Sequence, residues 1–389
     1  MKNKAYDMII VGAGSVGCPL ACFLAGEGLD VLLIDSHASP GQGQNKAAIG
    51  GVRATHSDPA KIRLCLDSIR TFSTWKQKHG IDIGWKSGGY CFPAFGEREE
   101  SILKGLLDTQ KAFGLNIDWV GPQRIKELIP GIVEQGLRGG TYSPDDGQVS
   151  PLKAAGAFAR EAVNLGAETR FNEKVTAFTV RKGRVHGVIT DRGSYAAAGV
   201  VIAAGAEARQ VGELAGLDLP VTPDSHEAGI TAPVKPFLDP LVVDIRPGLE
   251  GKTSNFYFGQ NSEGQIIFCY TPSELFVGTN RESTSEFMPV IAARIVSLIP
   301  AMKNLLVRRI WRGLYPMTPD GIIILDRVRE PDGVFVAVGM CGQGMMLGPG
   351  VARCMTEVIV RGKPTIDPDT YKSLSLYRDF HQARKEALK

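Results

Sequence analysis

The stretch "MIIVGAGSVGCPLACFLAGEGLDVLLIDS", residues 8–36, decides the fold of this chain. An apolar run ends at Gly12, and Gly14 and Gly17 open an apolar segment that is long enough for a helix. About twenty residues later, a second apolar run ends at Asp35. A strand, a glycine turn, a helix, a strand and an acidic residue in this order are the fingerprint of a βαβ unit that binds a dinucleotide.

Each residue type in this fingerprint has a physical task. Gly12 permits the tight turn out of the strand, Gly14 lets the backbone approach a pyrophosphate, and Gly17 lets the helix pack closely on the sheet. Unpaired N–H groups at the helix N-terminus attract the phosphates. Asp35 can accept hydrogen bonds from a ribose diol. NAD and FAD share this fingerprint, and a glycine-rich turn without a ligand is the remaining alternative.

Composition restricts the class of protein. The chain has 389 residues, of which 43% are hydrophobic and 22% charged, and this size allows two domains. Its net charge is +3, and its Lys and Arg residues are spread along the chain, which argues against a nucleic-acid partner. The seven cysteines show no zinc-type spacing, so we expect reduced, buried residues of a cytoplasmic protein and no metal site. Because Glu27 and Asp30 interrupt the first apolar segment, we expect neither a membrane span nor a targeting segment.

Hydrophobic periodicity predicts elements along the rest of the chain. Helical spacing covers residues 59–78, 97–113, 121–130, 151–165 and 285–300. Strand patterns cover residues 85–95, 169–180, 185–190, 198–205, 217–288 and 334–338. The chain thus returns to the first sheet twice. We predict a dinucleotide-binding domain from residues 1–84, 142–212 and 311–389, and a substrate domain from residues 85–141 and 213–310. Because an NAD domain is usually one contiguous block, this interleaving favours FAD.

A second glycine loop helps to distinguish FAD from NAD. The buried strand 334–338 leads into Gly339, Gly342 and Gly344, after which residues 348–350 are expected to start a helix. Such a loop lets backbone approach a planar ring and directs a helix N-terminus at it. A reduced flavin is negatively charged around its N1–C2=O edge, which this arrangement would stabilise. A glycine-rich connection without a ligand is the alternative.

Six motifs together resemble the D-amino-acid oxidase superfamily, in the branch of sarcosine oxidase β-subunit, L-proline dehydrogenase β-subunit and glycine oxidase. They are the opening fingerprint, "GGVR" ending at Arg53, "DGQVSP" (146–151), "VVIAAGA" (200–206), "WRGLYPMTPDG" (311–321) and "VFVAVGMCGQGMMLGPGVA" (334–352). The resemblance implies an α/β fold with a glutathione-reductase-like, Rossmann-type FAD domain and an α+β substrate domain with a mostly antiparallel sheet. It also implies oxidation of an amine next to a carboxylate by hydride transfer to flavin N5, giving an imine that hydrolyses.

The resemblance also implies which residues hold FAD. They are Gly12, Gly14, Ser15, Val16, Gly17, Asp35, Ser36, Gln44, Asn45, Val175, Ala204, Gly205, Gly313, Gly342, Gln343, Gly344, Met345 and Met346.

Three residues are candidates for the chemistry. Arg53 matches the family's arginine that binds the substrate carboxylate, a task that suits a planar guanidinium. Tyr315 matches a tyrosine beside the flavin that could order the substrate, unless it only packs at a strand edge. Lys46 matches a position near the flavin, although a solvated lysine is the alternative. His56 and His226 lie near these segments, and we expect them to be hydrogen-bonded structural residues rather than bases.

Two departures from the family pattern change what we expect of flavin attachment and of the substrate. Gly313 stands where monomeric sarcosine oxidases carry the cysteine that binds flavin covalently, so we expect noncovalent FAD. Met346 replaces a lysine that aids carboxylate binding, which favours proline-like or bulkier N-substituted amino acids over sarcosine.

Two other functions remain open at this point. One is oxidation of a 2-hydroxy acid or a polyol phosphate, and the other is a flavin subunit of a larger electron-transfer complex. Oxygen, a protein or a quinone could accept the electrons, and partner subunits or a homo-oligomer are compatible with the family. Coupling to a respiratory chain would place the protein at the membrane periphery.

Overall fold

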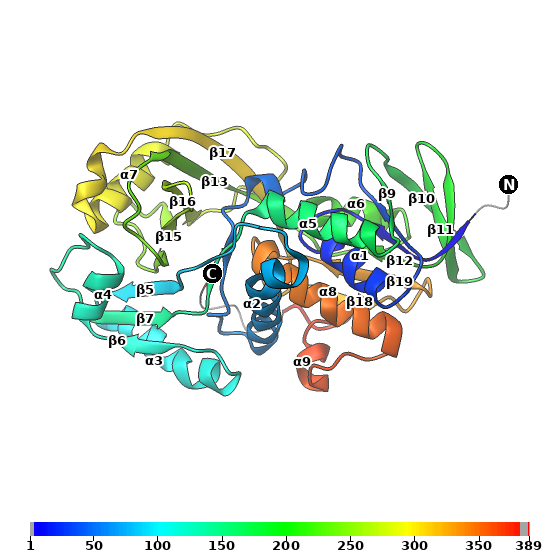
Figure 1. Cartoon of the computed structure of the whole chain (residues 1–389), viewed down its shortest axis with the longest axis horizontal. Helices are drawn as coiled ribbons and strands as arrows, with labels where there is room; N and C mark the ends of the chain where they lie inside the picture. The colour runs from blue at the N-terminus through cyan, green and yellow to red at the C-terminus, as the bar shows by residue number, and fades with distance from the viewer. Residues whose placement is uncertain (1–3, 382–387, 389) are drawn as a thin grey trace.

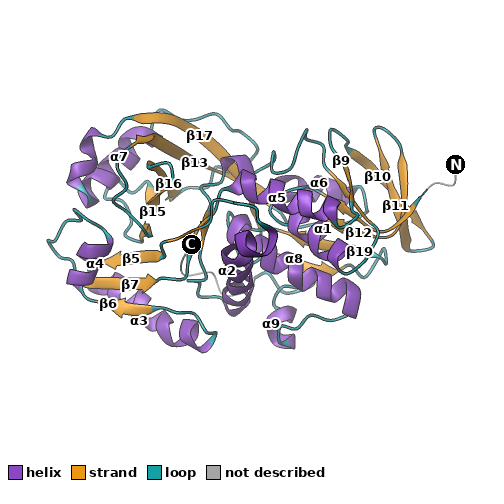
Figure 2. Ribbon diagram, viewed as in Figure 1, coloured by secondary structure: helices purple, strands orange, loops and turns teal. Residues whose placement is uncertain are grey.

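A computed structural model describes residues 4–381 and residue 388 of the chain. Figure 1 shows two lobes side by side, each built around its own sheet, with helices α2 (Pro59–His79) and α8 (Gly344–Arg361) near their junction. Figure 2 shows that helices are packed around both sheets. In the part of the chain that the structure describes, no helix is long and apolar enough to cross a membrane.

The first sheet holds the opening fingerprint. Its strands are β1 (Ala5–Val11), β2 (Val31–Ile34), β9 (Glu168–Arg170), β10 (Val175–Arg181), β11 (Arg184–Thr190), β12 (Ser194–Ile202), β18 (Ile324–Arg327) and β19 (Val334–Val338). β1 pairs in parallel with β2 and β12, and β12 pairs in parallel with β19. β2 and β19 are buried along their whole length, and β1 and β12 are buried toward their carboxyl ends, because both faces of the sheet are covered there. The carboxyl ends of the parallel strands therefore meet at one edge.

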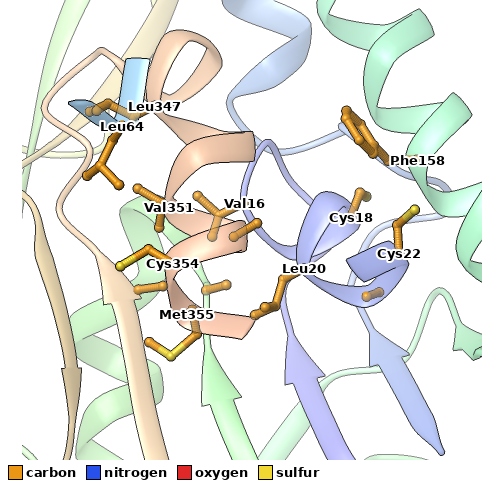
Figure 3. Close-up of a cluster of buried hydrophobic side chains, with 14 of the residues drawn as sticks. Val16, Cys18, Leu20, Cys22, Leu64, Phe158, Leu347, Val351, Cys354 and Met355 are labelled. Carbon is orange, nitrogen blue, oxygen red and sulfur yellow. The ribbon is translucent and has the colours of Figure 1, made fainter. Parts of the chain in front are cut away.

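Four helices cover one face of this sheet. They are α1 (Gly17–Gly26), α2, α5 (Pro151–Asn164) and α8. Figure 3 shows α1 between α8 and α5. Val16 and Leu20 lie toward Val351 of α8, and Cys22 lies toward Phe158 of α5. The short helix α6 (Ala208–Glu213) contributes to the core on the opposite face. All seven cysteines are free and buried, as the sequence predicts.

The second sheet is mostly antiparallel. Its strand order is β17 (Val307–Met317), β13 (Thr222–Pro233), β16 (Gln265–Pro272), β15 (Thr253–Gln260), β14 (Leu241–Asp244), β5 (Tyr90–Ala94), β7 (Gly139–Ser143) and β6 (Asp118–Val120). Helices α4 (Pro122–Leu128) and α7 (Phe287–Leu298) share one core with it, and α3 (Glu97–Ala112) packs through Leu103 into another. Among the described residues, β5 and β14 form the one parallel pair of this sheet, and its other pairs are antiparallel.

Small elements join the two lobes. A three-stranded sheet has the order β3 (Gly51–Val52), β8 (Gly147–Gln148) and β4 (Lys86–Ser87). Three 3₁₀ helices, η1 (Asn45–Ala47), η2 (Gly205–Glu207) and η3 (Pro300–Asn304), and the short helix α9 (Pro368–Lys372) complete the described elements. Because β3 and β8 come from distant segments, their pairing fixes the position of the residues that follow β3.

The structure corrects several predicted boundaries. Helix α8 begins at Gly344 rather than at residue 348, because the turn at Gly342 already directs the chain into the helix, and Pro349 lies inside it. The predicted strand 85–95 is two strands, and 169–180 is interrupted at Asn172, which has a φ of 54°. Residues 278–286 form no strand, although the pattern predicts one.

The interleaved domain ranges stay a prediction, and two of their boundaries fall inside strands of the structure. The boundary before residue 311 falls inside β17, whose pairing with β13 continues to Met317. The boundary before residue 142 falls inside β7, which ends at Ser143. Residues 1–3, 382–387 and 389 of the predicted ranges lie outside the described residues.

Candidate active site

A cavity of about 960 Å³ lies at the carboxyl ends of the parallel strands and extends to the second sheet. Residues from both glycine loops line it, together with side chains of strands β13, β15, β16 and β17. Its size is at the upper end of the range for small-molecule sites, which suits a dinucleotide with a substrate beside it. A crevice outside the carboxyl ends of parallel strands is also where α/β proteins bind such ligands.

The first glycine turn is constrained by its neighbours. Gly12 has a φ of +111°, and a Cβ atom there would lie 2.4 Å from the carbonyl oxygen of Ala203. Asp35 braces the turn, because its Oδ2 accepts a hydrogen bond from the Ala13 N–H at 2.6 Å. Its Oδ1 accepts one from the His37 N–H at 2.8 Å. Asp35 therefore shapes the turn in addition to facing the cavity.

The second glycine loop packs directly on the first turn. A Cβ atom on Gly344 would lie 2.8 Å from Ser15 Oγ. Asn45 connects the two segments: its Oδ1 accepts a hydrogen bond from the Ser15 N–H at 3.1 Å, and its Nδ2 donates to Met345 Sδ at 3.4 Å. The two ends of the chain therefore meet around one cavity.

A pair of tyrosines stands next to the second loop. Gly342 has a φ of +80°, and a Cβ atom there would lie 2.2 Å from the ring of Tyr315, so only glycine allows this contact. The Tyr315 and Tyr257 hydroxyl oxygens are 2.8 Å apart. Burial raises the pKa of both tyrosines far above its ordinary value, so both hydroxyls keep their protons.

His226 also contacts the Tyr315 ring. The two rings are stacked with centroids 3.9 Å apart. Asp224 Oδ2 is 3.2 Å from His226 Nε2. Although burial acts to raise it, the pKa of Asp224 is held below its usual value by the hydrogen bond and charge of His226 and by backbone N–H donors. A strand places residues two apart on the same face, which brings both side chains to the cavity.

Arg53 lines the cavity directly after strand β3, and its residue exposure is only 6%. Its Nη1 donates to the Thr55 carbonyl, and its Nη2 donates to the Leu388 carbonyl at 2.6 Å. His56 is fully buried, with Nδ1 3.4 Å from Arg53 Nη1, and does not line the cavity. This placement agrees with a structural role for His56.

The structure brings almost all predicted cofactor residues together. Each of them except Gly17 lines the cavity, and Gly17 packs against the Gly12 carbonyl, as its close-packing role requires. Lys46 is exposed and does not line the cavity, whereas its neighbours Asn45 and Ala47 do. The structure thus places Lys46 as a solvated side chain.

Sequence reasoning missed Tyr257 and Asp224 as lining residues. Both lie in the segment that was predicted only as strand-like, 217–288. Alternation indicates that one face is buried, but it does not tell which strand ends reach the cavity. The spacing of Asp224 and His226 by two residues was the available signal, because it puts both side chains on the same face of a strand.

The residues present fit FAD. Helices α1 and α8 both begin at the cavity without a side-chain cap, so the positive ends of their dipoles can face a diphosphate and a ring edge. Gln343 Oε1 is buried and, among the described residues, has no hydrogen-bond partner. Because Gln343 lines the cavity, a ligand with a donor group would satisfy this oxygen.

Comparisons with known proteins agree with this site. The chain is 27% identical to glycine oxidase of Geobacillus kaustophilus over 371 residues, covering 93% of this chain and 95% of that protein. It is 26% identical to sarcosine oxidase subunit beta of Rhizobium meliloti, covering 92% and 85%. The crystal structure of L-proline dehydrogenase from P. horikoshii superposes with a TM-score of 0.91 at 27% identity, covering 98% and 100%.

Other curated relatives are longer, and the chain spans 44% or less of their length. The family described as FAD dependent oxidoreductase (DAO) matches residues 7–358. Its match extends from the first strand into helix α8 and so includes both glycine loops. The chain therefore belongs to the DAO family of FAD-dependent oxidoreductases.

Proposed function

We propose that this protein oxidises an amino acid or an N-alkyl amino acid at a carbon bonded to the amine nitrogen. One observation carries the proposal: the cavity that fits FAD continues to a group formed by Arg53, Tyr315, Tyr257 and His226. When bound, FAD supplies the two-electron acceptor for this reaction. Relatives named for glycine, sarcosine and L-proline support the same substrate class.

Arg53 is proposed to bind the substrate carboxylate. It brings a permanent positive charge to the cavity wall, and a guanidinium has five N–H donors, of which the Thr55 and Leu388 carbonyls take two. These two contacts also hold the side chain in one orientation. A fixed carboxylate fixes the α-carbon in turn, and orientation of this kind is a large part of catalysis.

The tyrosines and His226 are proposed to act on the amine. Because the Tyr315 and Tyr257 hydroxyls stay protonated, they can order the substrate by hydrogen bonds without taking up its proton. His226, held by Asp224, can take up the proton that an ammonium group must lose before oxidation. In this proposal His226 acts as a base at the site, whereas the sequence predicts a hydrogen-bonded structural residue.

Apolar side chains line the same end of the cavity. Leu241 and Val243 of β14, Ile49, and Met346 at the start of α8 lie on its wall. Such a wall favours a substrate with an apolar body, such as proline or a bulkier N-substituted amino acid, over one with a second charge.

The proposal is tested with the purified chain loaded with FAD. The flavin absorbance is followed anaerobically during titration with sarcosine, proline, glycine and D-amino acids, and in parallel with 2-hydroxy acids and a polyol phosphate. Bleaching by one of the amino acids supports the proposal. Bleaching by the hydroxy compounds alone refutes it, and bleaching by none of these compounds favours a flavin subunit that works only within a larger complex.

A further inference from the structure

A buried carboxyl group beside the site is not used by the proposed reaction. Asp146 belongs to the "DGQVSP" motif, directly precedes β8 and has 0% exposure. Its Oδ1 accepts a hydrogen bond from the Ala54 N–H at 3.0 Å, and its Oδ2 accepts one from Ser143 Oγ at 2.5 Å. The carboxyl group therefore connects strand β7 to the residue that follows Arg53.

The strand register explains this placement. β3 and β8 are antiparallel, with Gly51 opposite Gln148 and Val52 opposite Gly147. One further step in this register puts Arg53 opposite Asp146. At this point the Asp146 side chain, rather than a backbone carbonyl, receives the next N–H group. The backbone is thus fixed before Arg53 by the strand pair and after it by Asp146.

We propose that Asp146 is a positioning residue for Arg53, which holds the backbone at Ala54 so that the guanidinium enters the cavity in the direction that binds a substrate carboxylate. Asp146 does not line the cavity, so it acts through Arg53 alone. The inference rests on the proposed function, because it requires that Arg53 binds the carboxylate.

The hydrogen bonds that carry this role do not depend on the charge of Asp146. Burial raises its pKa to about 7, against the lowering effects of Ser143, Ala54 and Arg53. A protonated carboxyl group still accepts the Ala54 N–H through one oxygen and can donate to Ser143 Oγ through the other. Asparagine has the same shape and the same acceptor and donor, so Asp146→Asn keeps the connection, whereas Asp146→Ala removes it.

The experiment compares these two variants in the FAD-loaded protein. The dissociation constant of acetate is measured by calorimetry, and KM and kcat are measured with the amino acid that bleaches the flavin. We expect Asp146→Ala to raise both the acetate Kd and KM by about tenfold or more, with kcat and FAD content close to those of the parent protein. Asp146→Asn should restore Kd and KM to within about threefold. The exposed neighbour provides the control, Asp145→Asn.

A merely structural role gives a different result. An unchanged acetate Kd in Asp146→Ala, or an Asp146→Asn variant that is as weak as Asp146→Ala, overturns the inference. If Asp146→Ala does not fold, Ser143→Ala removes the other end of the connection. That variant should raise the acetate Kd in the same direction, and an unchanged Kd overturns the inference as well.

Arg53→Ala separates this inference from the proposed function. If Arg53→Ala leaves acetate binding unchanged, the proposed carboxylate site is refuted, and the role of Asp146 with it. If Arg53→Ala weakens acetate binding while Asp146→Ala does not, only the role of Asp146 is refuted.

Discussion

The hydroxyl oxygens of Tyr257 and Tyr315 lie 2.8 Å apart at the end of the cavity, although the residues belong to strands β15 and β17, which are not neighbours in the sheet. The Tyr315 ring packs closely on Gly342 and stacks with the His226 ring. Each hydroxyl therefore has a fixed partner before a substrate binds, which lowers the cost of ordering it during the reaction.

This pair leads to the first prediction. Tyr315→Phe should lower kcat/KM for the amino acid by about 3- to 10-fold, because it removes one neutral hydrogen bond. Tyr257→Phe should act in the same direction, and the double variant should lose less than the product of the two single effects, because the residues are in contact. Steady-state kinetics of the three variants checks this. Strictly multiplicative losses would show that the hydroxyls act independently.

Arg53 gives the second prediction. Arg53→Ala and Arg53→Lys should raise KM by about 10- to 100-fold, the effect of losing a charge-assisted hydrogen bond, while the bound flavin remains. KM and the flavin-to-protein absorbance ratio are the measurements. Arg70→Ala is the matched control, because Arg70 is an exposed arginine on α2. An unchanged KM in Arg53→Ala would refute the assignment.

The third prediction concerns the first glycine turn. Gly12→Ala should abolish FAD binding, because the new Cβ would lie 2.4 Å from the Ala203 carbonyl and φ is +111°. Flavin absorbance after purification checks it. Gly156→Ala is the control, since Gly156 lies in helix α5 with no neighbour within 4 Å of the added atom, and it should keep its flavin. Normal FAD content in Gly12→Ala would contradict the role of this turn.

The fourth prediction concerns covalent attachment. Denaturation with acid should release all flavin into the supernatant, because Gly313 has no side chain that could bind it. A Cβ atom there would also lie 2.8 Å from the Ala47 Cβ atom, so the space for a larger residue is already taken. Absorbance of the supernatant and the pellet checks this, and a yellow pellet would contradict it.

Asp146 gives the fifth prediction, on stability. Its pKa is about 7 in the folded protein, mainly because of burial, and near 4 in an unfolded chain. Between these values the folded state holds a proton that the unfolded state has lost, so this group's contribution to stability falls as pH rises from about 4 to 7.

Asp146→Asn removes this titration. Relative to the parent protein, its melting temperature should therefore improve as pH is raised from about 4 to about 7 and change little above that. Thermal melts at several pH values measure the difference, with Asp145→Asn as the control at an exposed neighbouring position. A difference between Asp146→Asn and parent that does not change with pH would contradict the raised pKa.

Local patterns predicted the elements that local forces determine. The turn at Gly12, the helix α1 and the strand that ends before Asp35 follow from residue spacing, and the structure confirms them. The start of α8 was predicted four residues too late, because Gly348 and Pro349 look like a helix boundary in sequence. In the structure Gly348 is inside the helix, and a Cβ atom on it would lie 2.0 Å from the Ser15 carbonyl.

The sequence by itself determined that a dinucleotide turn and a second glycine loop exist, because these depend on periodicity and on residues close along the chain, and it predicted two interleaved domains. Only the tertiary structure decided that Tyr257 and Asp224 reach the cavity, that Lys46 does not, and that Asp146 lies opposite Arg53. These relationships depend on how distant strands pair and on which end of each strand meets the cavity, and no local pattern in the chain contains that information.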